Sequence, residues 1–271
     1  MKVALAQTNI IWEDKEANLF QAESLISDAA KDSTDIIFFP EMSFTGFSMN
    51  TQVTGEKNRY AVDRISNIAK QGRIAVGFGW VRWHGDICEN VYTILDPSGN
   101  PVSEYVKMHP FSYSSEDDYF VGGNKVVVAD YKGVPFSTFI CYDLRFPEIF
   151  RAVAKEAHVI VVPACWPAKR AEHWKALLKA RAIENQVYIL GINCQGNIGG
   201  LYYSGDSCVI TPNGDVAVSM SGECGLLTYN LVDNVDDYRN GFPVLKDMKN
   251  IIGLPYMVED NFAQKVEKID A

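Results

Sequence analysis

The sequence predicts an α/β protein in which two mixed β-sheets pack face to face and helices cover the outer faces. Short runs rich in β-branched and apolar residues recur along the 271 residues and alternate with helical patterns. Some runs follow one another through a helix and others through a tight turn, so parallel and antiparallel pairing are both expected. About a dozen strands accompany four main helices, a ratio that favours two packed sheets.

The individual elements follow from local patterns in chain order. Runs with strand composition cover residues 2–7, 35–39, 74–83, 90–95, 101–107, 126–129, 136–140, 159–162, 187–192, 207–210, 216–219 and 226–231. Helical patterns cover residues 18–31, 58–71, 147–156 and 171–185. The third helix begins at Pro147, because proline suits the first helical turn. The fourth carries a buried stripe of Trp174, Leu177, Leu178 and Ala182. The turns at 96–100 and 211–215 contain Gly and Asn, which accept the positive φ of hairpin turns.

A single domain is predicted over residues 1–271. The composition is that of a globular protein, with 47% hydrophobic and 22% charged residues, and it shows no repeat or low-complexity linker. A chain of this length buries enough surface for a sizeable core. The tail at 241–271 carries Phe242, Leu245 and other apolar residues without clear periodicity. We expect this tail to dock on the body of the protein or on a partner subunit.

Charge and cysteine spacing exclude several classes of partner. A net charge of −9 disfavours nucleic acid and anionic membranes as partners, although a few well-placed cations still allow an anionic substrate. No apolar run reaches the roughly 18 residues of a membrane span, and the apolar start is broken at Gln7 without a cleavage site, so a cytoplasmic location is expected. The six cysteines form no C-x-x-C pair, so neither a disulfide framework nor a zinc site is expected. No metal or other cofactor is predicted.

Three reactive side chains stand where predicted strands end. Glu41 follows the strand at 35–39, Lys107 ends the strand at 101–107 and Cys141 follows the strand at 136–140. Taken singly, a solvated glutamate, an edge lysine and a core cysteine are the commoner interpretations. Ligands of α/β proteins bind beyond the carboxyl ends of strands, however, so the three together indicate a site.

These three residue types supply what the cleavage of an amide requires. Cys141 is the candidate nucleophile, and Glu41 can take the thiol proton, return it to the leaving amine and later activate water. Lys107 and the backbone N–H of Tyr142, directly after the nucleophile, can stabilise the oxyanion. The positive charge of Lys107 is also expected to favour the thiolate.

Motifs around these residues resemble the carbon–nitrogen hydrolase (nitrilase) superfamily, in which a Glu–Lys–Cys triad occurs in the same order. The matching strings are Phe39-Pro40-Glu41-Met42, Lys107-Met108-His109-Pro110-Phe111 and Cys141-Tyr142-Asp143-Leu144-Arg145-Phe146-Pro147-Glu148. Supporting strings lie at 3–7, 173–174 and 181–186, and the resemblance covers residues 2–240.

The resemblance implies a four-layer α-β-β-α sandwich that assembles as a homodimer or a higher homo-oligomer. It also implies a second glutamate between the lysine and the cysteine, for which Glu116 is the candidate ahead of Asp117 and Asp118. Pro110 departs from the leucine that is usual at this position of the family string, which puts the course of the loop carrying Glu116 in question.

Within the superfamily, the tract at 164–174 is similar to that of bacterial ω-amidases. The resemblance implies a small ω-amide of a dicarboxylate as substrate, of the 2-oxoglutaramate or 2-oxosuccinamate type, with release of ammonia. Arg170 is a candidate for binding the substrate carboxylate through paired N–H bonds, and Trp166 is a candidate for lining the pocket. Arg145 is instead expected to form an ion pair with an acid such as Glu148.

Other hypotheses compete with this one. His109 could serve as the base in a Cys–His hydrolase. Another small amide or an N-carbamoyl compound could be the substrate, or an amine could accept the acyl group in place of water. The protein could also be an inert binding protein that kept the fold. A metal role for His158, Cys165 or His173 is disfavoured, because their spacing does not resemble a ligand set.

Overall fold

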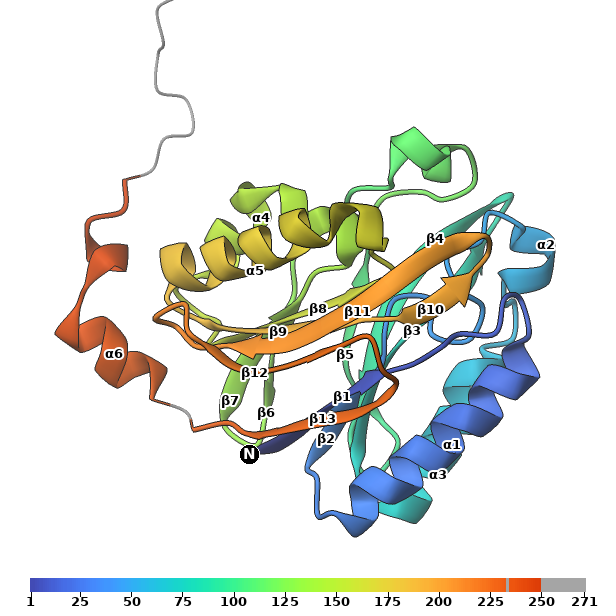
Figure 1. The fold of residues 1–271 in the computed structure, drawn as a ribbon, viewed down its shortest axis with the longest axis horizontal. Helices are drawn as coiled ribbons and strands as arrows, with labels where there is room; N and C mark the ends of the chain where they lie inside the picture. Colours follow the sequence, from blue (N-terminus) through green and yellow to red (C-terminus); the bar gives the residue numbers. More distant parts are fainter. Residues whose placement is uncertain (233, 250–271) are drawn as a thin grey trace, which may run out of the picture.

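The computed structural model describes residues 1–232 and 234–249, and it confirms the predicted sandwich (Figure 1). Two mixed sheets face each other. Helices α1 (Lys15–Lys31) and α3 (Tyr60–Gly72) cover the outer face of one sheet, and α4 (Pro147–Val153) and α5 (Ala171–Asn185) cover the outer face of the other.

The first sheet contains the N-terminal half of the fold and one late strand. Its order is β13 (Gly225–Asn230), β1 (Lys2–Gln7), β2 (Ile36–Phe38), β3 (Ala75–His84), β4 (Ile87–Leu95) and β5 (Pro101–Val106). Strands β1, β2 and β3 run parallel, and the other neighbours are antiparallel. Parallel pairs need a crossover connection, and α1 and α3 supply it here.

The second sheet repeats this plan. Its order is β10 (Gln195–Ile198), β11 (Leu201–Ile210), β9 (Tyr188–Asn193), β8 (Val159–Ala164), β7 (Val134–Thr138) and β6 (Val128–Tyr131), and β12 (Val216–Ser221) pairs with β11. Strands β7, β8 and β9 run parallel. Each sheet thus has a parallel centre and antiparallel edges, as the mixture of crossovers and tight turns predicted.

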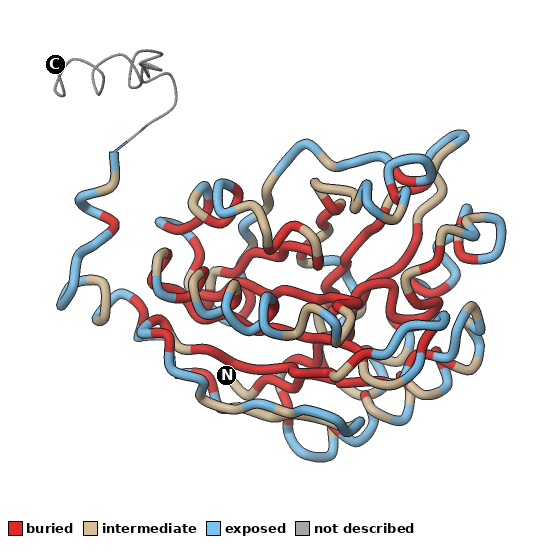
Figure 2. The backbone as a smooth tube through the Cα atoms, turned by 45° about the horizontal axis from the view of Figure 1, so that its top comes forward, coloured by how far each residue is buried: buried red, intermediate tan, exposed pale blue. Residues whose placement is uncertain are grey.

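The core lies in layers between these elements (Figure 2). Strand β1 shows how one strand serves two layers, because successive side chains point to opposite faces. Val3 and Leu5 pack in the cluster between the two sheets, whereas Ala4 and Ala6 pack with the helix-covered cluster that contains Leu19. Central strands buried on both sides therefore appear in the sequence as continuous apolar runs.

The largest difference from the predicted elements is the hairpin formed by β10 and β11. The sequence predicted a strand only over 207–210, but β11 begins at Leu201 and pairs with β10 through a turn in which Gly199 and Gly200 have positive φ. Leu201 and Tyr202 are more than half exposed. The first part of β11 therefore lacks the apolar pattern of a buried strand.

Several shorter differences have local causes. Helix α1 begins three residues before the predicted start, because the side chain of Asp14 caps it by accepting from the N–H of Ala17. Helix α4 ends at Val153 and not at 156. The short helices α2 (Thr51–Thr54) and α6 (Val235–Gly241) were not predicted.

The first part of the predicted tail contacts the body of the protein. The Nε2 of Gln186 donates to the C=O of Phe242 at 2.7 Å, and Leu245 is buried. Residues 250–271 lie outside the described residues, and the docking of the whole tail stays a prediction. In the described part of the chain, no helix combines the length and the apolar character needed to cross a bilayer.

Candidate active site

The fold brings the three predicted reactive residues together at one end of the two sheets. Glu41 follows β2 and Lys107 follows β5, both in the first sheet, whereas Cys141 follows β7 in the second. The Nζ of Lys107 lies 2.8 Å from the Oε1 of Glu41. All three residues are buried, and Cys141, at 9%, is the most exposed of them.

The Glu41 carboxylate accepts hydrogen bonds on both of its oxygens. Its Oε1 accepts from the Nζ of Lys107 and the Nδ2 of Asn90, both at 2.8 Å. Its Oε2 accepts from the backbone N–H of Cys165 at 3.0 Å. These donors fix the orientation of the carboxylate.

The backbone that carries Glu41 is held tightly against β3. The hydroxyl of Ser43 donates to the C=O of Pro40 at 2.6 Å and accepts from the N–H of Gly79 at 2.9 Å. A Cβ at Gly79 would lie 2.4 Å from the backbone nitrogen of Met42. Only glycine therefore permits this approach at position 79.

Lys107 lies between two buried carboxylates. In addition to Glu41, its Nζ contacts the Oε1 of Glu116 at 3.0 Å and the Oε2 at 2.8 Å. Burial alone would lower the pKa of Lys107, but the charges of Glu116 and Glu41 raise it well above its usual value, so the ammonium stays charged. Burial raises the pKa of Glu116, and Lys107 opposes this effect.

The structure selects one of the three consecutive acids at 116–118. Glu116 is fully buried, whereas Asp117 and Asp118 are exposed. The backbone N–H of Phe111 donates to the Oε2 of Glu116 at 2.6 Å and closes the loop on this side chain. The proline at 110 therefore does not prevent this loop from delivering Glu116 to Lys107.

Cys141 begins the 3₁₀ helix η3 (Cys141–Arg145) in a left-handed conformation, with a φ of 48°. This conformation is costly for a side chain with a Cβ, and such residues cluster at functional sites. The turn is braced by Asp143, whose Oδ2 accepts from the N–H of Ile140 at 2.9 Å. The thiol of Cys141 donates to the C=O of Cys165 across an S···O distance of 3.8 Å.

The Cys141 thiol is protonated at rest. Burial raises its pKa well above the usual value, the charge of Glu41 and a hydrogen bond to Glu41 add to this effect, and Lys107 opposes it. Lys107 favours the thiolate, as expected from the sequence, but burial and Glu41 outweigh the effect of the ammonium. Reaction at this sulfur requires a base, and Glu41 is within reach of the proton.

His109 has a structural environment. Its N–H and its Nδ1 contact the Oδ1 of Asp143 at 3.0 Å and 2.7 Å, and its ring stacks on Phe146 with centroids 3.8 Å apart. Tyr105 donates to the other oxygen of Asp143 at 2.8 Å. His109 thus braces the turn that carries Cys141.

Replacing His109 by alanine is therefore expected to cost stability and little activity. The free energy of unfolding should fall by about 1.5–3 kcal/mol, because a hydrogen bond to a charged group is lost. The value of kcat/KM should stay within about tenfold of the native value, against a loss of about 10²–10⁴-fold for Glu41→Gln. Amide hydrolysis and urea unfolding of both variants test this, and equal losses of activity would support a Cys–His mechanism.

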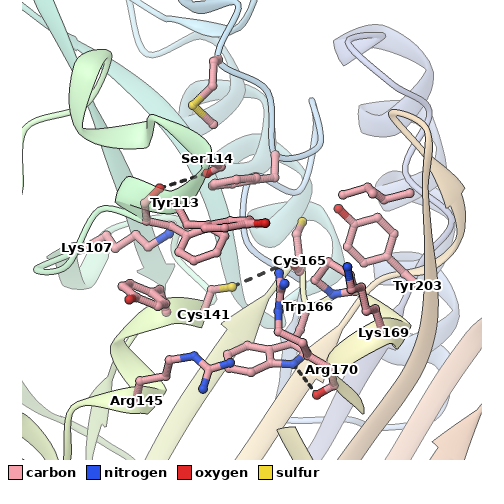
Figure 3. Close-up of a pocket in the computed structure, with 16 residues that line it drawn as sticks. Lys107, Tyr113, Ser114, Cys141, Arg145, Cys165, Trp166, Lys169, Arg170 and Tyr203 are labelled. Carbon is pink, nitrogen blue, oxygen red and sulfur yellow. Dashed lines mark hydrogen bonds between the residues drawn. The ribbon is translucent and has the colours of Figure 1, made fainter. Parts of the chain in front are cut away.

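A cavity of about 440 Å³ opens above Cys141 (Figure 3). Lys107 and Cys141 lie on one side of it and Lys169 and Tyr203 on the other. Aromatic and apolar side chains form much of the wall, including Phe47, Met49, Phe111, Trp166 and Leu201.

The charged side chains of the wall are all cationic. Lys107, Arg145, Lys169 and Arg170 line the cavity, and no Asp or Glu of the described residues does so. Arg145, Lys169 and Arg170 form no ion pair with any carboxylate in the described ranges. In a chain with a net charge of −9, this local excess of positive charge favours an anionic ligand.

The structure places Tyr142, Trp166 and Arg170 in the wall of this cavity. The N–H of Tyr142 lies in the first turn of η3, where backbone N–H groups have no acceptor within the helix. The indole N–H of Trp166 donates to the C=O of Arg170 at 2.8 Å, and the Arg170 guanidinium lies 5.5 Å from the centroid of the Phe111 ring.

The expected ion pair between Arg145 and Glu148 is not formed. The guanidinium of Arg145 lies 4.9 Å from the centroid of the Trp166 ring and 3.2 Å from the Nδ1 of His173. Arg145 precedes the first turn of α4, which begins at Pro147. The two side chains therefore do not lie on one helical face.

Two residues that donate hydrogen bonds to Glu41 were not identified as site residues in the sequence. Asn90 lies within β4, and a polar residue of low strand propensity before an apolar run is the signal that could have marked it. Cys165 follows β8 directly, at the same kind of strand end as the three reactive residues. The rule that identified those residues applies to Cys165 as well.

The fold and the site are those of an amidohydrolase. The family model described as "Carbon-nitrogen hydrolase" matches residues 2–240, so the chain belongs to the carbon–nitrogen hydrolase family, as predicted. It is similar to omega-amidase YafV of Yersinia enterocolitica, at 30% identity over 91% of this chain and 96% of the relative. It is also similar to 2-oxoglutaramate amidase of Bacillus subtilis, at 32% identity over 91% of this chain and 97% of the relative.

A solved structure gives the same assignment. The amidase from Nesterenkonia sp. AN1 is 27% identical and superimposes with a TM-score of 0.81 over 90% of this chain and 98% of its own. This structure is of a mutant of that amidase and shows the result of Michael addition of acrylamide at its active-site cysteine. The present chain is thus an enzyme that hydrolyses carbon–nitrogen bonds of amides, and the alternative of an inert binding protein is set aside.

Proposed function

We propose that this enzyme hydrolyses the ω-amide of a short dicarboxylate, of the 2-oxoglutaramate or 2-oxosuccinamate type, through a thioester on Cys141. The observation that carries the proposal is the small cavity above Cys141, whose charged wall residues are all cations. Such a substrate has a neutral amide to be cut and an anionic end to be held. The names of the two curated relatives support the same substrate class.

The reaction begins with proton transfer from Cys141 to Glu41. The sulfur attacks the amide carbon as its proton passes to the Glu41 carboxylate, which the donors on both of its oxygens hold in place. The C–N bond then breaks, and Glu41 returns the proton to the leaving nitrogen, so that ammonia departs and a thioester remains.

The tetrahedral oxyanion needs donors that are already in place. An ammonium has three N–H bonds. In Lys107 one N–H serves Glu41 and a second can serve both oxygens of Glu116, so a third is available toward the cavity, which Lys107 lines. The N–H of Tyr142 supplies the second donor.

Water completes the cycle. Glu41 takes a proton from a water molecule, the resulting hydroxide attacks the thioester carbon, and the sulfur leaves and regains a proton from Glu41. The products are the dicarboxylate and the free enzyme. Glu116 holds Lys107 charged and in place during both half-reactions.

Arg145 and Arg170 are the residues that would hold the substrate carboxylate. Guanidinium groups bind carboxylates through two parallel N–H···O bonds. Both arginines line the cavity beside aromatic rings, with Arg145 at Trp166 and Arg170 at Phe111. Arg145, which the sequence did not mark as a substrate-binding residue, thus joins Arg170 in this role.

The double variant Arg145→Met/Arg170→Met is expected to raise KM for 2-oxoglutaramate by about 100-fold, because charge-assisted hydrogen bonds to the anionic end are lost. The KM for a neutral amide of the same length should change little. Ammonia release at varied substrate concentration measures both effects. Arg73→Met, at the exposed C-cap residue that follows α3, is the matched control. An equal rise of KM for both substrates would contradict the assignment of Arg145 and Arg170 to the substrate carboxylate.

A panel of substrates tests the function itself. Ammonia release should be fastest with 2-oxoglutaramate or 2-oxosuccinamate, slower with neutral amides of equal length and slowest with N-carbamoyl amino acids. A preference for neutral amides or for N-carbamoyl compounds would overturn the proposal. The cytoplasmic location and the homo-oligomer expected from the sequence stay predictions, which fractionation and light scattering can test.

A further inference from the structure

Asn90 lies between the two carboxylates of the site. It is 1% exposed in β4, and its Nδ2 donates to the Oε1 of Glu41 at 2.8 Å and to the Oε1 of Glu116 at 3.1 Å. Its Oδ1 has no partner among the described residues. The reverse orientation of the amide would direct this oxygen at two carboxylates, so the surrounding charges fix which end points to them.

The same residue also locates the lysine. The backbone N–H of Lys107 donates to the C=O of Asn90 at 2.9 Å. One strand position thereby contacts all three charged members of the cluster, Glu41, Lys107 and Glu116. A buried asparagine with an unpartnered oxygen costs stability, and this cost needs a compensating role.

The charge balance of the cluster indicates what that role is. Glu41 and Glu116 carry two negative charges, whereas Lys107 carries one positive charge, and all three side chains are at most 1% exposed. Two like charges in one buried site tend to capture a proton. The two N–H bonds of the Asn90 amide are neutral donors that face both acids and stabilise both ionised forms.

We propose that Asn90 is a positioning residue for the proton transfer. It holds Glu41 ionised and oriented so that Glu41 can accept the proton of Cys141. This inference rests on the proposed function for the role of Glu41. It does not depend on which amide is the substrate.

Loss of the amide should therefore change the pH at which the base becomes active. Without Asn90, the carboxylate pair captures a proton more readily, and a protonated Glu41 cannot deprotonate the thiol. Activity should fall most at low pH and recover partly at high pH. The titratable groups that face Glu41 from the elements packed around it are Lys107, Glu116, Cys141, Cys165 and Tyr203.

Asn90→Leu is the variant of choice, because leucine has a similar shape and no donor. We expect kcat/KM at pH 7 to fall about 10–100-fold, as for the loss of hydrogen bonds to a charged group. The acid limb of the kcat/KM profile should move upward by about one pH unit or more. KM should change little, because Asn90 does not line the cavity. Thr93→Val is the matched control, since Thr93 is a buried polar residue of β4 that accepts from the Nε1 of Trp80.

Alkylation of Cys141 by iodoacetamide separates this inference from the substrate assignment. If Asn90 positions the base, the pH profile of alkylation in Asn90→Leu moves upward in the same way, even where no tested amide is cleaved. An unchanged alkylation profile in a folded Asn90→Leu variant overturns the inference. If that variant does not fold, Asn90→Asp keeps the shape and adds a third acid, so it should move the profile further upward. An unchanged alkylation profile in Asn90→Asp would likewise overturn the inference.

Discussion

Replacing Cys141 by alanine is expected to abolish ammonia release, with kcat reduced by about 10⁴-fold or more, because the loss of a nucleophile removes the covalent route entirely. No other side chain can substitute. Cys165 lines the same cavity, but its thiol donates to the C=O of Glu41 at 3.3 Å. A hydrogen bond with Cys194 and burial raise the pKa of Cys165 well above its usual value.

The fold of this variant should persist. Alanine meets the same backbone strain at a φ of 48° as cysteine does, and Asp143 still braces the turn. Ammonia release, thermal unfolding and mass spectrometry of the acyl-enzyme together test the prediction. Cys208→Ala is the matched control, because Cys208 is a buried thiol of β11 outside the cavity. Retained turnover in Cys141→Ala, or an equal loss in Cys208→Ala, would contradict the covalent mechanism.

The strand pattern and the reactive triad could be predicted from the sequence because both depend on local order. A strand buried on both faces is a run of apolar residues, and its carboxyl end is marked by the first reactive side chain after it. Glu41 and Cys141 stand at such ends, whereas Lys107 follows β5, a strand that is buried on one face only. The hairpin of β10 and β11 escaped prediction because glycine and polar residues interrupt the apolar pattern of both strands.

The remaining parts of the site depend on contacts between distant residues. Three consecutive acids at 116–118 are equivalent in composition, and only the loop closed by Phe111 decides that Glu116 is buried. The partners of the Asn90 side chain lie 49 and 26 residues away in sequence, so no local pattern reveals them. Arg145 turns to Trp166 because it ends η3, two residues before α4 begins, and is therefore not bound to the periodicity of α4.

Replacing Lys107 by methionine is expected to have the second large effect, on both activity and stability. The loss of one oxyanion donor lowers kcat by about 10²–10³-fold. The free energy of unfolding should also fall by about 3–5 kcal/mol, because Glu41 and Glu116 are left as buried charges without their cation. Hydrolysis rates and urea unfolding of the variant measure the two losses separately.

The pH dependence identifies the cause of the stability loss. Burial already raises the pKa of Glu116, and removal of Lys107 removes the charge that opposes this effect. A carboxyl group whose pKa is higher in the folded state than in the unfolded state binds more protons when folded, so its contribution becomes more favourable as the pH falls. The stability deficit of Lys107→Met relative to the native enzyme should therefore shrink on acidification from pH 8 toward pH 5 and be largest at high pH.

The double variant Lys107→Met/Glu116→Gln separates charge balance from catalysis. Removing one carboxylate together with the ammonium leaves a single buried anion, Glu41, which still accepts from Asn90 and from the N–H of Cys165. The free energy of unfolding should recover substantially, and most of the pH dependence seen in Lys107→Met should disappear. Turnover should stay as low as in Lys107→Met, because the oxyanion donor is still missing. Recovery of turnover together with stability would mean that Lys107 only balances charge, and the oxyanion would then need another donor.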